Sequence, residues 1–413
     1  MASRNSLVKG DNSFSKYVAI VYFMATIVLY TLPAVKILAP YVFVGLFMLL
    51  FLPIAMMKGS KEFNYVLLLL ITTLIAFYLN VLLGIYSLTE AINEAIRNIR
   101  FFLPVLWSMY VIKFCPPKHK KIILAFFFVL TTVILINTMI ALREDPWIAR
   151  ILAQDKLADT AAVRAYRMRN VGGFEFAYMM GIITLCFTWL AINVKKPLVR
   201  VLSIIVVATN FYYIIQTMYT TLLILTFVGV VLLFVFYVKT PSLKAILLLL
   251  CVVGVLLSAP ICLELSSLFG DSLLSKKFFQ IYQALSGEGY EVLGTRPELL
   301  LDAFKKFLLS PIWGGNKASV SAHSFILTLL ANNGLIGIIT FSSVFLQSRK
   351  LIVSELKARG NSTLLCDIAF VYIFVLAIMN PIGYVFEVCI AGFFIVPLFI
   401  VTTSELSFHR RLL

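Results

Sequence analysis

Residues 121–141 read KIILAFFFVLTTVILINTMIA, and no side chain after Lys121 in this stretch is charged. A helix needs about 20 apolar residues to cross the hydrocarbon core of a bilayer. The stretch therefore predicts a membrane-spanning helix. The whole chain has the same character, because 61% of its 413 residues are hydrophobic and only 13% are charged. This composition predicts an all-α integral membrane protein.

Similar apolar runs recur along the chain. They predict about twelve spanning helices in a single polytopic membrane domain over residues 1–413. The runs lie near residues 17–35, 39–57, 64–87, 98–114, 121–141, 173–193, 198–216, 217–238, 242–260, 323–347, 364–379 and 383–403.

The distribution of charge predicts the orientation. The basic N-terminal segment MASRNSLVKGDNSFSK precedes a run that has no small-residue cleavage site, which indicates a retained first helix. Placing this segment in the cytoplasm makes every cytoplasmic connection basic, so we expect both termini there. The net charge of +16 is then topogenic, and no separate basic domain indicates a nucleic-acid partner.

Two long connections face the outside in this topology. The first covers residues 142–172. The second covers residues 261–322, between the ninth and tenth helices, and we expect it to be catalytic because long loops in compact bundles are usually functional. The six cysteines contain no CxxC pair, and we predict buried thiols rather than a disulfide or metal site, with no cofactor.

His323 is the only one of the three histidines that falls on the outside. It lies where the second long connection re-enters the membrane, and it could donate to an anion or accept a proton near neutral pH. The alternative is an interfacial histidine with a backbone partner.

Arg296 begins a predicted amphipathic helix near residues 296–309. Thr295 and Glu298 have the capping-box spacing, and Pro311 ends the pattern. One predicted face carries Leu300, Phe304, Phe307 and Leu308, and the other carries Asp302, Lys305 and Lys306. We expect the apolar face to lie against the bundle or the lipid surface. An arginine in the first turn is suited to grip a phosphate, although pairing with Glu298 or a lipid headgroup is the alternative.

Three further arginines, Arg164, Arg167 and Arg169, lie in the first outer connection, with no acidic residue between Ala161 and Phe174. They predict either contact with anionic lipid headgroups or a second phosphate clamp before Gly172 and Gly173. The sequence has no DxD, HExxH, Walker or GxSxG motif. Its cations therefore predict an anion site beside lipid, for which a lipid-linked pyrophosphate is the natural ligand.

The segment 293–337 resembles the bacterial O-antigen and capsule polymerases and the O-antigen ligases. It contains an arginine after LGT, a helix that ends in SPIWGG, His323 followed by Ser324, and the sequence GLIG at 334–337. The resemblance extends in hydropathy over most of the chain.

The resemblance implies a glycosyltransferase of the bacterial cytoplasmic (inner) membrane that uses undecaprenyl-pyrophosphate-linked oligosaccharides as donor and acceptor on the outer, periplasmic face. It implies catalytic roles for Arg296, at the donor pyrophosphate, and for His323, at the acceptor hydroxyl or the pyrophosphate. Arg164, Arg167 and Arg169 are the candidate second clamp, and Arg169 is the first choice because it lies closest to the membrane entry. A chain-length-regulating co-polymerase is a candidate partner.

One departure separates the two activities. Ligases of this kind show an arginine after a mid-chain turn, in a context like QTR, whereas this chain reads QTMYTT at 216–221. The stretch NVGGFEFAY at 170–178 resembles the polymerases instead. Polymerisation of repeat units into O-antigen or capsular polysaccharide is the favoured prediction. The alternatives are a ligase that transfers glycan to lipid A-core and a transporter or flippase of lipid-linked glycan.

Asn332 and Asn333 interrupt the run that follows His323. Gly334 and Gly337 are expected to permit close helix packing. The two amides fit either hydrogen bonding across that contact or the lining of a polar cavity.

Overall fold

The computed structural model of the chain describes residues 13–38, 60–152, 160–238, 240–270, 273–286, 296–314, 324–380 and 386–408. These residues form helices and turns, with no strand among them. The helical fold class expected from the sequence is therefore confirmed for the described part of the chain.

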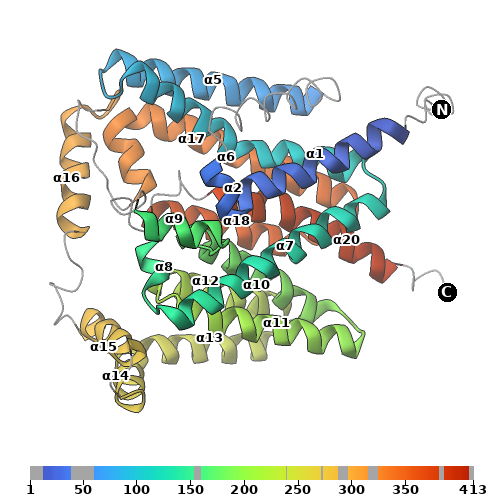
Figure 1. The fold of residues 1–413 in the computed structure, drawn as a ribbon, viewed down its shortest axis with the longest axis vertical. Coiled ribbons are helices and arrows are strands. Elements are labelled where there is room, and N and C mark those ends of the chain that lie inside the picture. The colour runs from blue at the N-terminus through green and yellow to red at the C-terminus, as the bar shows by residue number, and fades with distance from the viewer. Residues whose placement is uncertain are drawn as a thin grey trace.

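The long helices lie side by side in one bundle (Figure 1). They are α1 (Ser13–Thr31), α5 (Ser60–Leu82), α6 (Leu88–Phe114), α7 (Pro117–Glu144), α10 (Phe174–Asn193), α11 (Pro197–Gln216), α12 (Thr220–Tyr237), α13 (Pro241–Leu256), α17 (Phe325–Ala358), α18 (Leu364–Met379) and α20 (Val396–Phe408). The shorter helices are α2 (Pro33–Leu38), α8 (Ile148–Ile151), α9 (Ala161–Met168), α14 (Ser258–Leu268), α15 (Leu273–Ser286), α16 (Arg296–Leu309), α19 (Phe386–Cys389) and the π-helical η3 (Ile390–Ile395).

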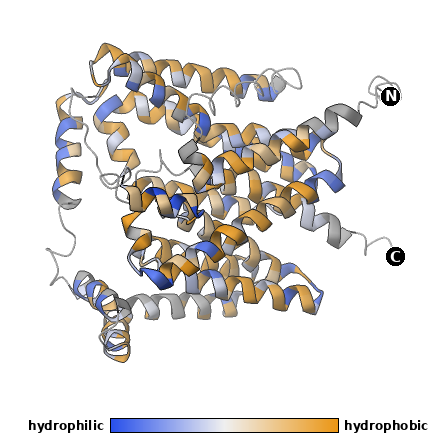
Figure 2. Ribbon diagram, in the orientation of Figure 1, coloured by the Kyte–Doolittle hydropathy of each residue, from blue (hydrophilic) through white to orange (hydrophobic). Residues whose placement is uncertain are grey.

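Eight helices in the described part are long and apolar enough to cross a membrane. Two shorter apolar helices, Ala19–Thr31 and Leu364–Met379, lie in the same bundle. Figure 2 shows that the long helices are mainly hydrophobic. The predicted span at 39–57 lies outside the described residues, and the total of about twelve spans stays a prediction.

Two ends of the bundle can be told apart. α1 begins and α20 ends at one side, which we call the terminal end (Figure 1). α8, α9 and α16 lie at the opposite side, which we call the site end. The two long connections predicted from the sequence thus contain helices: α8 and α9 in the first, and the end of α14 together with α15 and α16 in the second.

An aromatic seam holds the centre of the bundle. The rings of Phe102 and Phe393 stack with centroids 6.3 Å apart, which joins α6 to η3. Phe341 of α17 lies 5.6 Å from Phe102, and Phe370 of α18 lies 5.0 Å from Phe393. Rings at these separations add attraction beyond their area of burial, so the seam fixes α17 against α6 and η3.

α17 is broken at Gly334, whose backbone angles are φ 60° and ψ −156°. Gly334 does permit a close approach, as expected, but its neighbour is the turn at Ile312–Gly314 rather than another helix. The residue lies in a backbone region that only glycine enters easily, and it divides α17 into two half-helices. Sequence spacing alone does not reveal such a dihedral angle.

α16 spans Arg296–Leu309, the range over which the sequence predicts an amphipathic helix. Its contact with the bundle is made by the buried Ala303, which packs with Ala331 and Leu327 of α17. Phe304 and Leu308 are exposed, although the sequence predicts that they share one apolar face with Leu300. The expected apolar face therefore divides into a part against the bundle and a part that the described residues leave open.

Candidate functional site at the α16–α17 junction

The turn after α16 docks on the break in α17. The amide of Leu335 donates to the carbonyl oxygen of Pro311 over 2.8 Å, and that of Ile336 donates to Ile312 over 3.3 Å. The first amides of a helix have no partner within the helix itself. The turn supplies those partners, so the second half of α17 is capped by a segment that precedes it in the sequence.

Glycine is required on both sides of this contact. A β-carbon on Gly314 (φ +89°) would lie 2.2 Å from the carbonyl oxygen of Asn332. One on Gly334 would lie 2.4 Å from the carbonyl oxygen of Ile312. The atoms in the way belong to the backbone and have little freedom to shift, so the two backbones meet only because both side chains are absent.

Two amide side chains tie the break to the end of α5. Asn333 donates from Nδ2 to Oδ1 of Asn80 over 3.0 Å, and Asn332 donates from Nδ2 to the hydroxyl of Tyr86 over 3.4 Å. Both asparagines of α17 are buried. Of the two roles left open by the sequence, hydrogen bonding between helices is the one observed. The partners lie on α5 and in the α5–α6 turn, not across a glycine contact.

The start of α17 is also fixed. Ser324 is its buried N-cap, and its Oγ accepts from the amide of Leu327 over 3.2 Å. The amide of Phe325 donates to the carbonyl oxygen of Asn380 over 3.1 Å, and Nδ2 of Asn380 donates to the hydroxyl of Tyr178 over 3.3 Å. The helix that follows His323 in the sequence is thereby held between α18 and α10.

The two predicted catalytic residues adjoin this unit in the sequence. Arg296 is the first residue of α16, and its side chain lies outside the described part of the structure. His323 lies wholly outside the described residues, and it immediately precedes Ser324.

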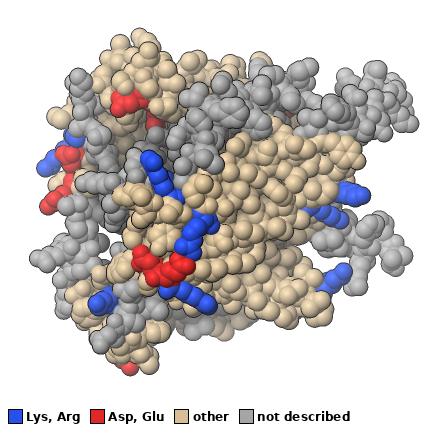
Figure 3. Space-filling model, in the orientation of Figure 1, with Lys and Arg blue, Asp and Glu red and all other residues tan. Residues whose placement is uncertain are grey.

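α9 carries the basic cluster predicted in the first connection. Val163 is the buried side chain of this helix. Arg164 is exposed and Arg167 is half-buried. Figure 3 shows Lys and Arg gathered with Asp and Glu over this part of the site end, while the long helices present mainly uncharged side chains on this face. The cluster is thus mixed in charge, unlike the purely basic segment that the local sequence suggests.

Arg169 is engaged by an acidic partner. Its two terminal nitrogens donate to the two carboxylate oxygens of Glu144, each over 2.8 Å, and its guanidinium lies 5.6 Å from the ring centroid of Tyr166. The hydrogen bonds that Arg169 donates to the Glu144 carboxylate raise the pKa of Arg169. Arg169 therefore joins the end of α7 to the turn after α9, which the sequence did not indicate because the two residues belong to separate elements.

The turn after α9 is anchored on several sides. Asn170 (φ 57°) accepts from the amide of Ala34 over 3.2 Å. The amide of Gly172 donates to Oγ1 of Thr138 over 2.8 Å, and Nδ2 of Asn137 donates to the carbonyl oxygen of Arg169 over 3.0 Å. The entry to α10 is therefore held by hydrogen bonds to α7.

Arg100 is a candidate that the sequence analysis did not single out. It lies within α6, and its guanidinium carbon is 5.1 Å from the ring centroid of Tyr30 on α1. An arginine inside a spanning segment is a functional signal in its own right. The apolar sequence FFLPVLW directly after Arg100 is the feature that could have identified it.

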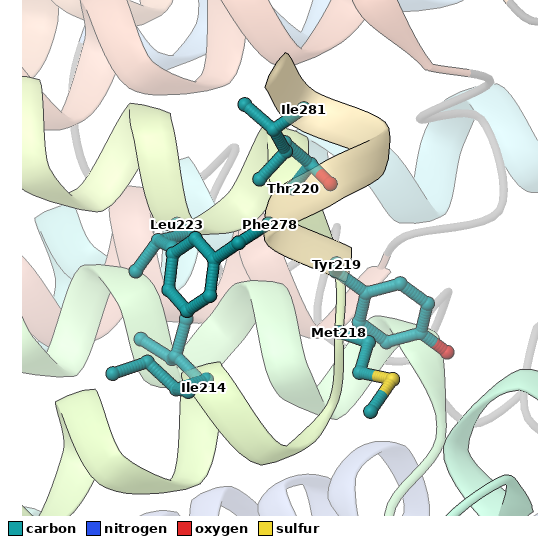
Figure 4. Close-up of a pocket in the computed structure, with 8 residues that line it drawn as sticks. Ile214, Met218, Tyr219, Thr220, Leu223, Phe278 and Ile281 are labelled. Carbon is teal, nitrogen blue, oxygen red and sulfur yellow. The ribbon is translucent and has the colours of Figure 1, made fainter. Parts of the chain in front are cut away.

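An apolar cavity lies between α15 and the α11–α12 turn. Figure 4 shows Phe278 and Ile281 of α15 with Ile214 and Leu223 around it. Its uncharged lining comprises Ile214, Ile215, Met218, Tyr219, Thr220, Leu223, Phe278 and Ile281. Met218, Tyr219 and Thr220 of the QTMYTT segment line the cavity, in the stretch where the ligase resemblance would have required an arginine.

Among the residues that the structure describes, no group of three or more His, Cys, Asp or Glu side chains could hold a metal ion. No protein-family model matches this sequence, and a search of curated proteins finds no match either.

Proposed function

We propose that this chain is a membrane glycosyltransferase that polymerises undecaprenyl-pyrophosphate-linked repeat units into O-antigen or capsular polysaccharide. The observation that carries the proposal is the hydrogen bond between Leu335 and Pro311. It joins SPIWGG and GLIG, two separate parts of the segment that resembles the polymerases. Arg296 and His323 flank the two halves of that unit in the sequence.

The proposed reaction needs charge stabilisation and one proton acceptor. An acceptor hydroxyl oxygen attacks the anomeric carbon of the donor glycan, and the bond from that carbon to the pyrophosphate oxygen breaks. Undecaprenyl pyrophosphate leaves with the electron pair, and Arg296 stabilises its charge. His323 takes the proton of the hydroxyl. Arg164, Arg167 and Arg169 are proposed to attract the anionic donor to the same end of the bundle.

The proposed topology has about twelve spans, cytoplasmic termini and a site that faces the outside of the inner membrane. Two observations support it. The start of α1 and the end of α20 lie opposite α9 and α16 (Figure 1). Basic residues lie where the chain turns from one helix to the next at the terminal end. Lys118 and Lys121 follow the end of α6, and Lys195 and Lys196 lie between α10 and α11. The positive-inside rule requires such residues on the cytoplasmic side.

Ligation to lipid A-core is the alternative within the same chemical class. The apolar surroundings of Met218 and Tyr219 weigh against it, because a ligase-type arginine has no counterpart there. Transport of the glycolipid is the alternative from a different class, and the break in α17 favours it. Discontinuous helices often form the substrate sites of transporters.

Purified protein in lipid vesicles with lipid-linked repeat units, alone or with lipid A-core, separates these activities. A ladder of glycan lengths without the core supports polymerisation. Product that forms only with the core would replace this proposal by ligation. Movement of intact glycolipid across the vesicle membrane, with no new glycosidic bond, would replace it by transport.

A further inference from the structure

The surface of α16 has three arcs. The first faces the bundle through the buried Ala303, with the partly buried Leu300 and Phe307 beside it. The second is apolar and open: Leu301 is 53% exposed, Phe304 46% and Leu308 58%. Residues three and four apart share a helical face, so these three side chains form one stripe.

The third arc carries four of the five charged residues of α16, and the fifth is Arg296, the first residue of the helix. The arc contains Glu298, Asp302, Lys305 and Lys306, and Lys306 pairs with Asp302 over 3.1 Å. Two acidic and two basic side chains balance, so this arc has no net charge. If α16 met only water and the bundle, the apolar stripe between the other two arcs would stay in water and would contribute no burial energy.

The open stripe continues onto a spanning helix. Ile312 and Trp313 follow α16 and are also exposed. The carbonyl of Ile312 accepts from Ile336, next to the exposed Leu335 of α17, and Ile339 extends the same exposed side one turn further. A lipid-facing side of a spanning helix is covered by hydrocarbon, so the stripe on α16 adjoins lipid already required by α17.

The orientation and length of α16 fit a helix in the plane of the membrane surface. Figure 1 shows α16 lying across the direction of the long helices at the site end. Its 14 residues extend about 21 Å, less than the roughly 30 Å hydrocarbon core, so it does not span.

We propose that α16 is an interfacial helix, with Leu301, Phe304 and Leu308 inserted into the lipid leaflet at the site end and its charged arc in water. Interfacial helices bury their apolar face about 5–10 Å into the boundary between headgroups and acyl chains. The first residue of the helix, Arg296, is then held at the level of the lipid headgroups. Because the charged arc is balanced, insertion is driven mainly by apolar area, and Arg296 is the one charge of α16 left to meet a lipid headgroup. The inference concerns the position of α16 and does not depend on the proposed reaction.

Spin labels on the full-length chain in phosphatidylcholine vesicles test the proposal. Single cysteines at Phe304 and Leu308 report the open stripe, and single cysteines at Glu298 and Lys305 are the controls on the same helix, with the native cysteines replaced. We expect the ratio of collisions with oxygen to collisions with a water-soluble nickel complex to be several-fold higher at 304 and 308 than at 298 and 305. Equal, water-like ratios would overturn the proposal. Protection from both reagents at 304 and 308 would also overturn it, because protein would then cover the stripe.

Trp313 gives a second measurement in which the native cysteines are kept. Phospholipids brominated near the headgroup should quench part of the fluorescence of the unmodified chain, and W313F should lose that part. Quenching that is the same in W313F and the unmodified chain would contradict the inserted position.

Discussion

The amide nitrogen of Leu335 lies 2.8 Å from the carbonyl oxygen of Pro311 and donates a hydrogen bond to it. This contact makes the turn after α16 the cap of the second half of α17. The break in a spanning helix therefore exposes no uncapped amide at these positions, which is the condition for tolerating irregular backbone at membrane depth.

Gly334→Ala should destabilise the protein strongly. The backbone conformation alone costs a non-glycine residue about 1–3 kcal/mol, and the new β-carbon would meet the carbonyl of Ile312 at 2.4 Å. Thermal unfolding of the detergent-solubilised protein measures the loss. Gly360→Ala is the control, because Gly360 also has a positive φ but no atom lies within 4 Å of its added β-carbon. An equal loss in both variants would show that docking against Ile312 adds nothing.

Asn80 and Asn333 should be energetically coupled. Replacing either by alanine leaves the other amide buried without this 3.0 Å hydrogen bond, so the double variant should lose less stability than the sum of the single variants. We expect a coupling of about 0.5–1.5 kcal/mol from a double-mutant cycle. Asn193→Ala is the control, because that exposed side chain bonds only within its own helix, to Trp189. Additive losses at Asn80 and Asn333 would contradict a direct contact.

The arginines of α9 should differ in their effect on donor binding. Arg169 is bound in bidentate fashion to Glu144, whereas Arg164 extends from the exposed side of α9. In the proposed reaction, Arg164→Gln and Arg167→Gln should raise the KM for the lipid-linked donor several-fold, and Arg169→Gln should raise it less. An Arg169→Gln effect larger than the other two would restore Arg169 as the main donor contact.

Arg296→Ala and His323→Ala should each lose most transferase activity while the protein still inserts in the membrane. The first removes the proposed partner of the leaving pyrophosphate, and the second removes the proposed proton acceptor. Initial rates of glycan formation at equal amounts of membrane-inserted protein measure the effect. Lys305→Ala, a charge on the water-facing arc of α16, should leave the rate within about twofold. Near-normal rates in both test variants would remove these two residues from the site.

The sequence predicts the helical class and the range of α16 because both follow from local pattern. Apolar runs fix the spans, and Pro311 ends the helix that begins at Arg296. The helical spacing groups Phe304 with Leu300 on one apolar face. Which part of that face meets protein depends on the position of Ala331 on α17, and the local sequence does not give this position.

The candidate site is less accessible to sequence reasoning. Asn332 and Asn333 are conspicuous in an apolar run, yet their partners Asn80 and Tyr86 lie far away in the chain. The break at Gly334 depends on a dihedral angle and on a turn that docks from outside the helix. The ion pair of Arg169 with Glu144 likewise joins elements that only the fold brings together.

The central claim is that this chain moves glycan from one lipid pyrophosphate to the next, and the release of the carrier tests it most directly. Vesicles that contain the protein and radiolabelled lipid-linked repeat units should form one free undecaprenyl pyrophosphate for each glycosidic bond made, and Arg296→Ala should suppress both products together. Glycolipid that crosses the vesicle membrane intact, with no carrier released, would contradict the account.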